Sequence, residues 1–145
     1  MSTHTCIRLL FIWFSLALLC QTATANDKII SPERIEGTTI VDAEDLIELA
    51  TQKQELVLID SRISADHKEG YIEGSVSLPD TDTSCESLAR TVPAPASPVL
   101  FYCNGIKCGR SARAALVAVD CGYTNIYWYR KGMEEWQEKE YPLVQ

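Results

Sequence analysis

The chain has 145 residues, of which 46% are hydrophobic, and a formal net charge of −7 at pH 7. This acidic balance disfavours nucleic acid and anionic membranes as partners, because both bind basic protein surfaces. The length and the hydrophobic content are those of one globular domain that has its own core.

Residues 1–25 have the pattern of a secretory signal peptide. Arg8 supplies positive charge, residues 9–19 are apolar apart from Ser15, and Ala23-Thr24-Ala25 offers a small-x-small cleavage site. We expect cleavage near Ala25, a periplasmic protein, and no stable membrane insertion afterwards, because the apolar run is shorter than the about 20 residues of a membrane span. An uncleaved anchor is the alternative. Loss of Arg8, the only charged side chain in this segment, changes the formal net charge from −7 to −8.

The remaining chain is predicted to consist of a polar leader arm, residues 26–37, and one domain, residues 38–145. Apolar runs predict strands, and apolar side chains at helical spacing predict helices. In chain order these are strand 38–41, helix 43–50, strand 55–60, helix 64–69, strand 75–78, helix 82–90, strand 99–102, helix 110–121, strand 125–129 and helix 133–139. This alternation predicts an α/β domain of three layers, with a mostly parallel central sheet flanked by helices.

Cys103 is the most informative residue of the chain. It follows the apolar run 98–102 and precedes a glycine-containing loop that leads into the helix 110–121. In parallel sheets, ligands bind at the carboxyl ends of the strands, where Asp60 also falls. Loop N–H groups, the helix dipole, Lys107 and Arg110 all favour a thiolate, which is the reactive form of cysteine. The alternative is a buried structural cysteine.

Three ordered segments of the sequence carry a family resemblance. The first comprises Leu58-Ile59-Asp60-Ser61-Arg62, residues 66–75 and Leu78-Pro79; the second is residues 101–112; the third is residues 131–136 followed by Tyr141-Pro142. They resemble, in that order, the amino-terminal signature, the active-site loop and the closing motif of rhodanese domains. The resemblance extends from Thr38 to Leu143.

The resemblance implies a rhodanese-like fold and a sulfurtransferase with Cys103 as catalytic nucleophile. The Cys103 thiolate would take the outer sulfur of a small anionic donor such as thiosulfate, hold it as a persulfide, and pass it to a thiol or cyanide acceptor. The implied donor-binding loop consists of Asn104, Gly105, Ile106, Lys107, Cys108, Gly109 and Arg110. Asp60 and Arg62 match a pair that supports the site, and no cofactor or metal ion is implied.

The loop length distinguishes this interpretation from a phosphatase. Protein phosphatases of a related fold use a Cys-x5-Arg loop that holds phosphate. Here the sixth residue after Cys103 is Gly109, and Arg110 is the seventh. The sequence therefore favours sulfur over phosphate as the group that is bound.

Cys108 is the most informative departure from the family pattern, because a basic residue is frequent at that position. Cys108 is expected either to resolve the persulfide or sulfenate of Cys103 as a disulfide, or to be a small residue turned into the loop wall. Two cysteines without nearby histidines fall short of a four-ligand zinc site. Tyr71 stands where the family often has histidine, and Lys131 where glycine is usual. His67 is expected to be packed rather than catalytic.

Two other functions remain open from the sequence. The pair Cys103 and Cys108 also fits a thiol–disulfide redox protein in an oxidising compartment. A module that carries or senses sulfur without turnover is the other alternative. Cys85 and Cys121 are interpreted as part-buried thiols, with a disulfide between them as the alternative. No protein partner is assigned.

Overall fold

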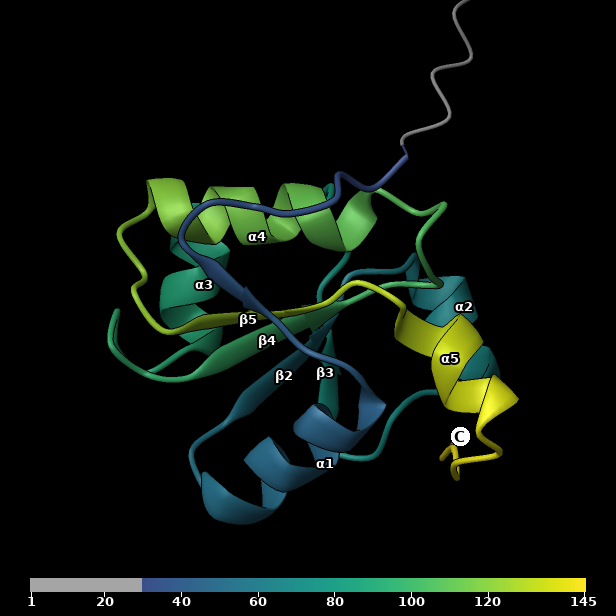
Figure 1. Cartoon of the computed structure of the whole chain (residues 1–145). Coiled ribbons are helices and arrows are strands. Elements are labelled where there is room, and N and C mark those ends of the chain that lie inside the picture. Colours follow the sequence, from purple (N-terminus) through teal and green to yellow (C-terminus); the bar gives the residue numbers. More distant parts are fainter. Residues whose placement is uncertain (1–29) are drawn as a thin grey trace, which may run out of the picture.

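The computed structural model describes residues 30–145, so the predicted signal peptide and residues 26–29 of the leader arm lie outside the described part (Figure 1). Strands and helices alternate along these residues as predicted, with ends that differ by no more than three residues. Their bounds are β1 (Thr38–Ile40), α1 (Ala43–Gln52), β2 (Val57–Asp60), α2 (Ser64–Glu69), β3 (Ser75–Ser77), α3 (Cys85–Thr91), β4 (Val99–Tyr102), α4 (Arg110–Asp120), β5 (Ile126–Tyr129) and α5 (Gly132–Glu138).

The strands form one sheet in the order β1-β5-β4-β2-β3, and every pair in it is parallel. Tyr102, the last residue of β4, is in register with Asp60 of β2 on one side and Tyr129 of β5 on the other. The carboxyl ends of these three neighbouring strands therefore meet at one edge of the sheet. The predicted α/β class with a mostly parallel sheet is confirmed.

Helices cover both faces of the sheet, which gives the three layers that the alternation predicts (Figure 1). Alternate residues of β4 divide between the two sides, since successive side chains of a strand point to opposite faces. Val99 and Phe101 join the core beneath α3 and α4, whereas Leu100 and Tyr102 join the core beneath α1 and α5. All four are fully buried, which explains why β4 is apolar throughout.

Side-chain caps define where two helices begin. Asp42 caps α1 in a reciprocal capping box with Asp45. The helix predicted from residue 82 instead begins at Cys85, because Ser84 forms the capping box and its hydroxyl accepts from the N–H of Ser87. Residues 79–83 form turns ahead of it, in which the N–H of Asp82 donates to the carbonyl of Pro79.

Cys85 and Cys121 form a disulfide, so the interpretation of these residues as part-buried thiols is wrong and the alternative holds. Cys85 is the first residue of α3, and Cys121 follows the last residue of α4. The two helices pack on the same face of the sheet, which brings the Cα atoms to 5.4 Å, within the range that a disulfide spans. The sequence does not show that these two helix ends are neighbours.

The described part of the leader arm, residues 30–37, packs against the domain. Ile35 is part of the core beneath α3 and α4, and Ser31 is buried. Arg130, which follows β5, donates through Nε to the carbonyl of Pro32 at 2.6 Å. None of the helices in residues 30–145 is long and apolar enough to cross a membrane.

Candidate active site

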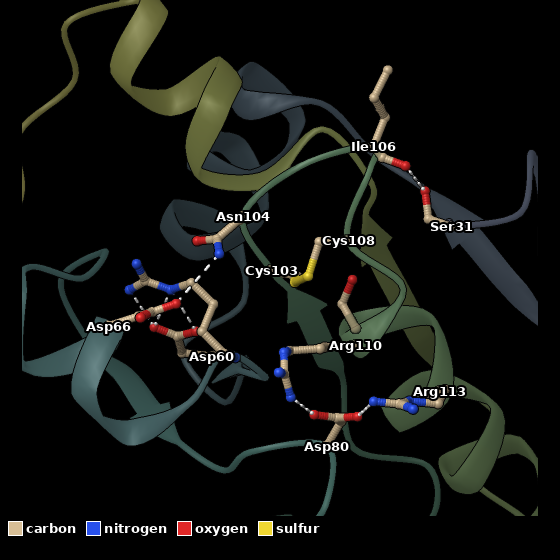
Figure 2. The surroundings of a disulfide bond; sticks show 12 residues. Ser31, Asp60, Asp66, Asp80, Cys103, Asn104, Ile106, Cys108, Arg110 and Arg113 are labelled. Carbon is tan, nitrogen blue, oxygen red and sulfur yellow. Dashed lines mark hydrogen bonds and ion pairs between the residues drawn. A yellow bond between two sulfur atoms is a disulfide. The ribbon is translucent and has the colours of Figure 1, made fainter. Parts of the chain in front are cut away.

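Cys103 lies directly after β4, at the central position of the sheet edge (Figure 2). Only 1% of its surface is exposed. The loop that follows leaves the strand, turns back and enters α4, so residues 104–110 curve over the sulfur. The structure therefore brings the predicted nucleophile and the predicted donor-binding loop together.

Cys103 and Cys108 are joined by a disulfide, with their Cα atoms 6.3 Å apart (Figure 2). Cys108 reaches the nucleophile because the loop makes a tight turn, in which the N–H of Cys108 donates to the carbonyl of Gly105 at 2.9 Å. Of the two cysteines, Cys108 is half-buried and is therefore the more accessible. Cys108 therefore contacts the nucleophile directly, which favours the expectation that it resolves Cys103 over a position in the loop wall.

Most N–H groups of the loop are available to a ligand. Within residues 30–145, the amides of residues 104–107 and 109–112 donate to no recorded protein acceptor. Those of residues 110–112 belong to the first turn of α4, where the helix dipole adds partial positive charge. Such a set of donors suits an anion, whether a thiolate, a persulfide or an incoming oxyanion.

The first half of the loop is fixed by three segments that are distant in sequence. Ser31 Oγ donates to the carbonyl of Ile106 at 2.7 Å, and Asn104 Nδ2 donates to Asp66 at 3.3 Å (Figure 2). The N–H of Glu134, in α5, donates to the carbonyl of Asn104 at 2.7 Å. The sequence gives no sign of these supports, because they depend on which loops become neighbours in the fold.

Gly132 supports Cys103 through close backbone contact. Its φ of +54° is in the left-handed region, and a Cβ atom at this position would collide with the carbonyl of Cys103. The next residue, Met133, donates its N–H to that same carbonyl at 2.9 Å. Only glycine allows the start of α5 to lie this close to the nucleophile.

Arg110 forms an ion pair with the buried carboxylate of Asp80 (Figure 2). Its Nη1 atom lies 2.8 Å from Asp80, which also binds Arg113 and follows β3 by three residues. The charges of Arg110, Arg113 and Asp80 sum to +1 near the loop. The exposed Lys107 adds a second positive charge. Arg110 therefore braces the start of α4 as well as contributing charge, a function that the sequence did not reveal.

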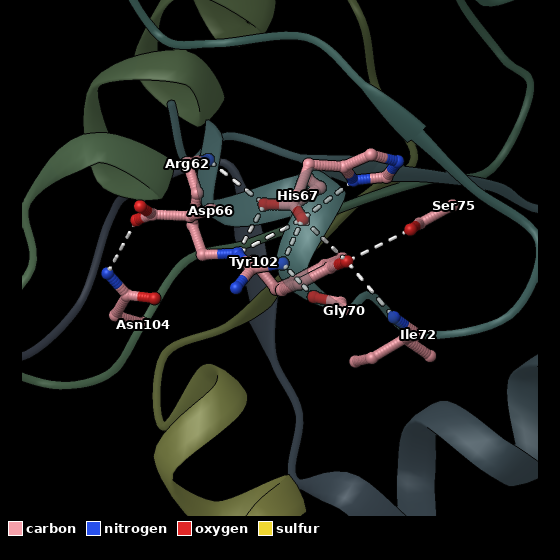
Figure 3. Close-up of polar contacts among 9 residues, drawn as sticks. Arg62, Asp66, His67, Gly70, Ile72, Ser75, Tyr102 and Asn104 are labelled. Carbon is pink, nitrogen blue, oxygen red and sulfur yellow. Dashed lines mark hydrogen bonds and ion pairs between the residues drawn. The ribbon is translucent and has the colours of Figure 1, made fainter. Parts of the chain in front are cut away.

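Asp60 and Arg62, the predicted supporting pair, form a buried ion pair beside the loop (Figure 3). Arg62 donates to Asp60 through both Nε and Nη2, and Nη2 also reaches the carbonyl of Gly70 at 2.7 Å. The hydroxyl of Tyr102 donates to Asp60 at 3.0 Å, and His67 Nδ1 lies 2.9 Å from the same carboxylate. These contacts join the ends of β2 and β4.

The buried network affects the titration of its members. Burial alone would raise the pKa of Asp60, but hydrogen bonds from Arg62 and His67 outweigh it and hold this pKa below its usual value. Burial and the neighbouring Asp60 charge raise the pKa of Tyr102 far above that of a free phenol. Asp60 is therefore ionised and Tyr102 neutral at physiological pH, as the hydrogen bonds between them require.

His67 and Tyr71 stack on each other beside the buried ion pair. Their ring centroids are 4.1 Å apart, and His67 reaches Asp60 through Nδ1. The stacked pair keeps one imidazole in contact with the carboxylate. His67 is packed as expected, and it also contributes a hydrogen bond that the sequence did not predict.

In the part of the chain that the structure describes, no three His, Cys, Asp or Glu side chains gather closely enough to hold a metal ion. An open groove of 460 Å³ borders the loop. It is lined by Ile106 of the loop and by charged residues that follow β5 or belong to α5, namely Arg130, Lys131, Glu134, Glu135 and Glu138. Both signs of charge line this groove.

A parallel five-stranded sheet with a cysteine loop at the carboxyl end of its central strand is the architecture of rhodanese-like α/β domains. The chain belongs to this family, because the family model described as the rhodanese-like domain matches residues 42–139. No curated protein is significantly similar to the chain in sequence.

Solved structures of the same fold include several sulfurtransferases. The human single-domain sulfurtransferase TSTD1 is 24% identical, with a TM-score of 0.57 over 69% of this chain and 96% of that one. The polysulfide-sulfur transferase of Wolinella succinogenes is 21% identical, with a TM-score of 0.59 over 74% and 79%. Thiosulfate sulfurtransferase from Pseudomonas aeruginosa is 22% identical, with a TM-score of 0.61 over 74% of this chain and 20% of that one. At these identities the likeness concerns the fold.

Proposed function

We propose that this protein is a sulfurtransferase in which Cys103 carries the transferred sulfur as a persulfide. The observation that carries the proposal is the position of Cys103 at the end of β4, beneath a loop whose N–H groups are available to an anion. Family membership and the sulfurtransferases among the proteins of similar fold also support it.

In the first half-reaction, the reduced Cys103 thiolate attacks the outer sulfur of a donor such as thiosulfate. The sulfur–sulfur bond of the donor breaks, sulfite leaves with the electron pair, and a new sulfur–sulfur bond forms on Cys103. Lys107 and the net positive group formed by Asp80, Arg110 and Arg113 attract the anionic donor. The loop N–H groups stabilise the charge of the persulfide.

In the second half-reaction, a thiol or cyanide attacks the outer sulfur and releases the Cys103 thiolate. Since Cys103 is almost fully buried, the persulfide sulfur extends from it toward the loop opening. The acceptor approaches over the exposed residues Asn104, Ile106 and Lys107.

We also propose that the protein acts after export to the periplasm, following cleavage near Ala25. The disulfides Cys85–Cys121 and Cys103–Cys108 support this location, because such bonds persist in oxidising compartments. Intact mass of the protein recovered from the periplasm tests the location and the cleavage site together.

Formation of thiocyanate from thiosulfate and cyanide tests the proposed function. After reduction, the wild-type protein is expected to produce thiocyanate, whereas Cys103→Ser lowers the rate by at least about a thousandfold, because the nucleophile is lost. A Cys121→Ser variant is the matched control, since it removes a cysteine from the other disulfide and keeps the wild-type rate. Full activity of Cys103→Ser would refute the assignment.

Thiol–disulfide exchange is a second candidate, favoured by the bond between Cys103 and Cys108. It requires no sulfur donor. Reduction of a disulfide substrate by the dithiol protein in the absence of thiosulfate, together with no persulfide in its presence, identifies this function instead.

A further inference from the structure

We propose that Cys108 reduces the sulfur bound to Cys103, so that the protein can release hydrogen sulfide without an external acceptor. This inference rests on the proposed persulfide of Cys103. It assigns an activity, dithiol-dependent reduction of a sulfane sulfur donor, to the same loop. The product is then sulfide and not a sulfurated acceptor.

The disulfide shows that Cys108 Sγ and Cys103 Sγ come within bonding distance of each other. The atom that Cys108 contacts is thus the inner sulfur of a persulfide on Cys103. Attack on the inner sulfur expels the outer sulfur, whereas attack on the outer sulfur would only move it to Cys108.

Contacts other than the disulfide hold both cysteines in place. The carbonyl of Cys103 accepts the N–H of Met133, and the N–H of Cys108 donates to the carbonyl of Gly105. Gly105 itself is buried and lies next to the side chain of Glu134. The reduced loop therefore keeps Cys108 beside Cys103, and the reaction between them is intramolecular, which gives it a large advantage over an external thiol.

The two cysteines also differ in exposure in the disulfide form. Cys103 is 1% exposed, whereas Cys108 is half-buried. An external reductant is therefore better placed to attack Cys108 than Cys103, so that regeneration of the two thiols begins at Cys108.

The electrons and atoms balance over three steps. Cys103 takes one sulfur from thiosulfate and sulfite leaves. The Cys108 thiol gives up its proton and its thiolate attacks Cys103 Sγ; the bond to the outer sulfur breaks, and the outer sulfur leaves with the electron pair and takes up that proton to become hydrosulfide. The sulfane sulfur is reduced by two electrons and the cysteine pair is oxidised to the disulfide. An external dithiol then attacks Cys108 Sγ and restores both thiols.

A single-turnover experiment tests this inference. The purified protein is reduced, freed of reductant, and mixed with excess thiosulfate in the absence of any added thiol. We expect one sulfite and one sulfide per molecule, with residues 103 and 108 recovered as a disulfide by peptide mass mapping. Cys108→Ser is expected to release sulfite but no sulfide, and to retain one extra sulfur on Cys103.

A Cys85→Ser/Cys121→Ser variant is the matched control, because it excludes the other cysteine pair as the source of electrons and is expected to release the same sulfide as the wild type. If the wild type keeps the extra sulfur and releases no sulfide, the inference fails although the persulfide stands. If Cys108→Ser releases as much sulfide as the wild type, the inference also fails, and the persulfide still stands. If no protein releases sulfite or gains sulfur, the proposed sulfurtransferase function fails as well.

Discussion

The two disulfides within residues 30–145 differ in the length of chain that they enclose and in their place in the fold. Cys85–Cys121 joins two helix ends that are 36 residues apart in sequence, on the face of the sheet opposite α1 and α5. Cys103–Cys108 joins residues only 5 apart, within one loop and at the carboxyl edge of the sheet. The first connects elements that are already packed, and the second occupies the atom on which the proposed chemistry depends.

Chain entropy separates the two bonds further. A crosslink stabilises a fold mainly by restricting the unfolded chain, and the effect grows with the number of residues enclosed. This gives about 4 kcal/mol for a separation of 36 and about 2 kcal/mol for a separation of 5. We therefore expect Cys85–Cys121 to be structural and Cys103–Cys108 to be exchangeable at small cost to the fold.

Removal of the structural disulfide is expected to give the largest effect on stability. The double variant Cys85→Ser/Cys121→Ser should lower the free energy of unfolding by about 4 kcal/mol, measured by urea denaturation without reductant. Its rate of thiocyanate formation should equal that of the wild type at a temperature where both are folded. Loss of activity without loss of stability would reverse the roles assigned to the two bonds.

Substitution of Asp60 is expected to have the next largest effect on stability. Its buried ion pair with Arg62 lies at the edge of the sheet, next to the exchangeable disulfide Cys103–Cys108. Asp60→Asn leaves Arg62 buried without its partner, so we expect a loss of about 3 kcal/mol at pH 7. Asp120→Asn is the control, because Asp120 is exposed.

The effect of Asp60 should also depend on pH. The pKa of Asp60 is lower in the folded than in the unfolded state. Its contribution to the free energy of unfolding is therefore complete above the unfolded-state pKa and is lost as pH falls through the folded-state pKa. The difference between wild type and Asp60→Asn should therefore shrink as pH is lowered from about 5 toward 2, in urea denaturation series. A difference that stays constant over this range would contradict the ion-pair account.

Gly132 tests whether backbone packing holds the nucleophile. Gly132→Ala combines the strain of a positive φ, about 1 kcal/mol, with a collision against the Cys103 carbonyl, and should cost about 2 kcal/mol in total. Gly122→Ala is the matched control, because Gly122 has a φ of +87° but no atom within 4 Å of the added Cβ. Only Gly132→Ala should also slow thiocyanate formation, so equal rates for both variants would contradict the proposed support.

The smallest effect on stability is expected from the bond inside the loop. Cys108→Ser should lower the free energy of unfolding by about 2 kcal/mol or less. The same urea measurement as for the structural disulfide gives the comparison directly. If both bonds contribute equally, the distinction between a structural and an exchangeable disulfide fails.

Local patterns in the sequence were sufficient for the elements, the layer order and the position of Cys103. Strands, caps and the cysteine loop are encoded within a few residues of each other, as the capping box at Asp42 illustrates. The supports of the site are not encoded in this way. Asp80, Gly132 and Ser31 reach the loop from three distant segments, so their roles follow only from the packed fold.

The cysteine pairs show the same limit. Four cysteines allow three pairings, and the choice depends on which elements become neighbours. Cys85 reaches Cys121 only because α3 and α4 pack on the same face of the sheet. The contact between His67 and Asp60 is similar, because the sequence does not show that the helix carrying His67 lies beside the end of β2.

The persulfide of Cys103 is the central claim, and peptide mass mapping of the reduced Cys108→Ser protein after exposure to thiosulfate tests it most directly. This variant lacks the thiol that would remove the sulfur from Cys103. The account predicts one additional sulfur atom on the peptide that contains Cys103 and none on those containing Cys85 or Cys121. Sulfite release without added sulfur on Cys103, or added sulfur only on another cysteine, would contradict it.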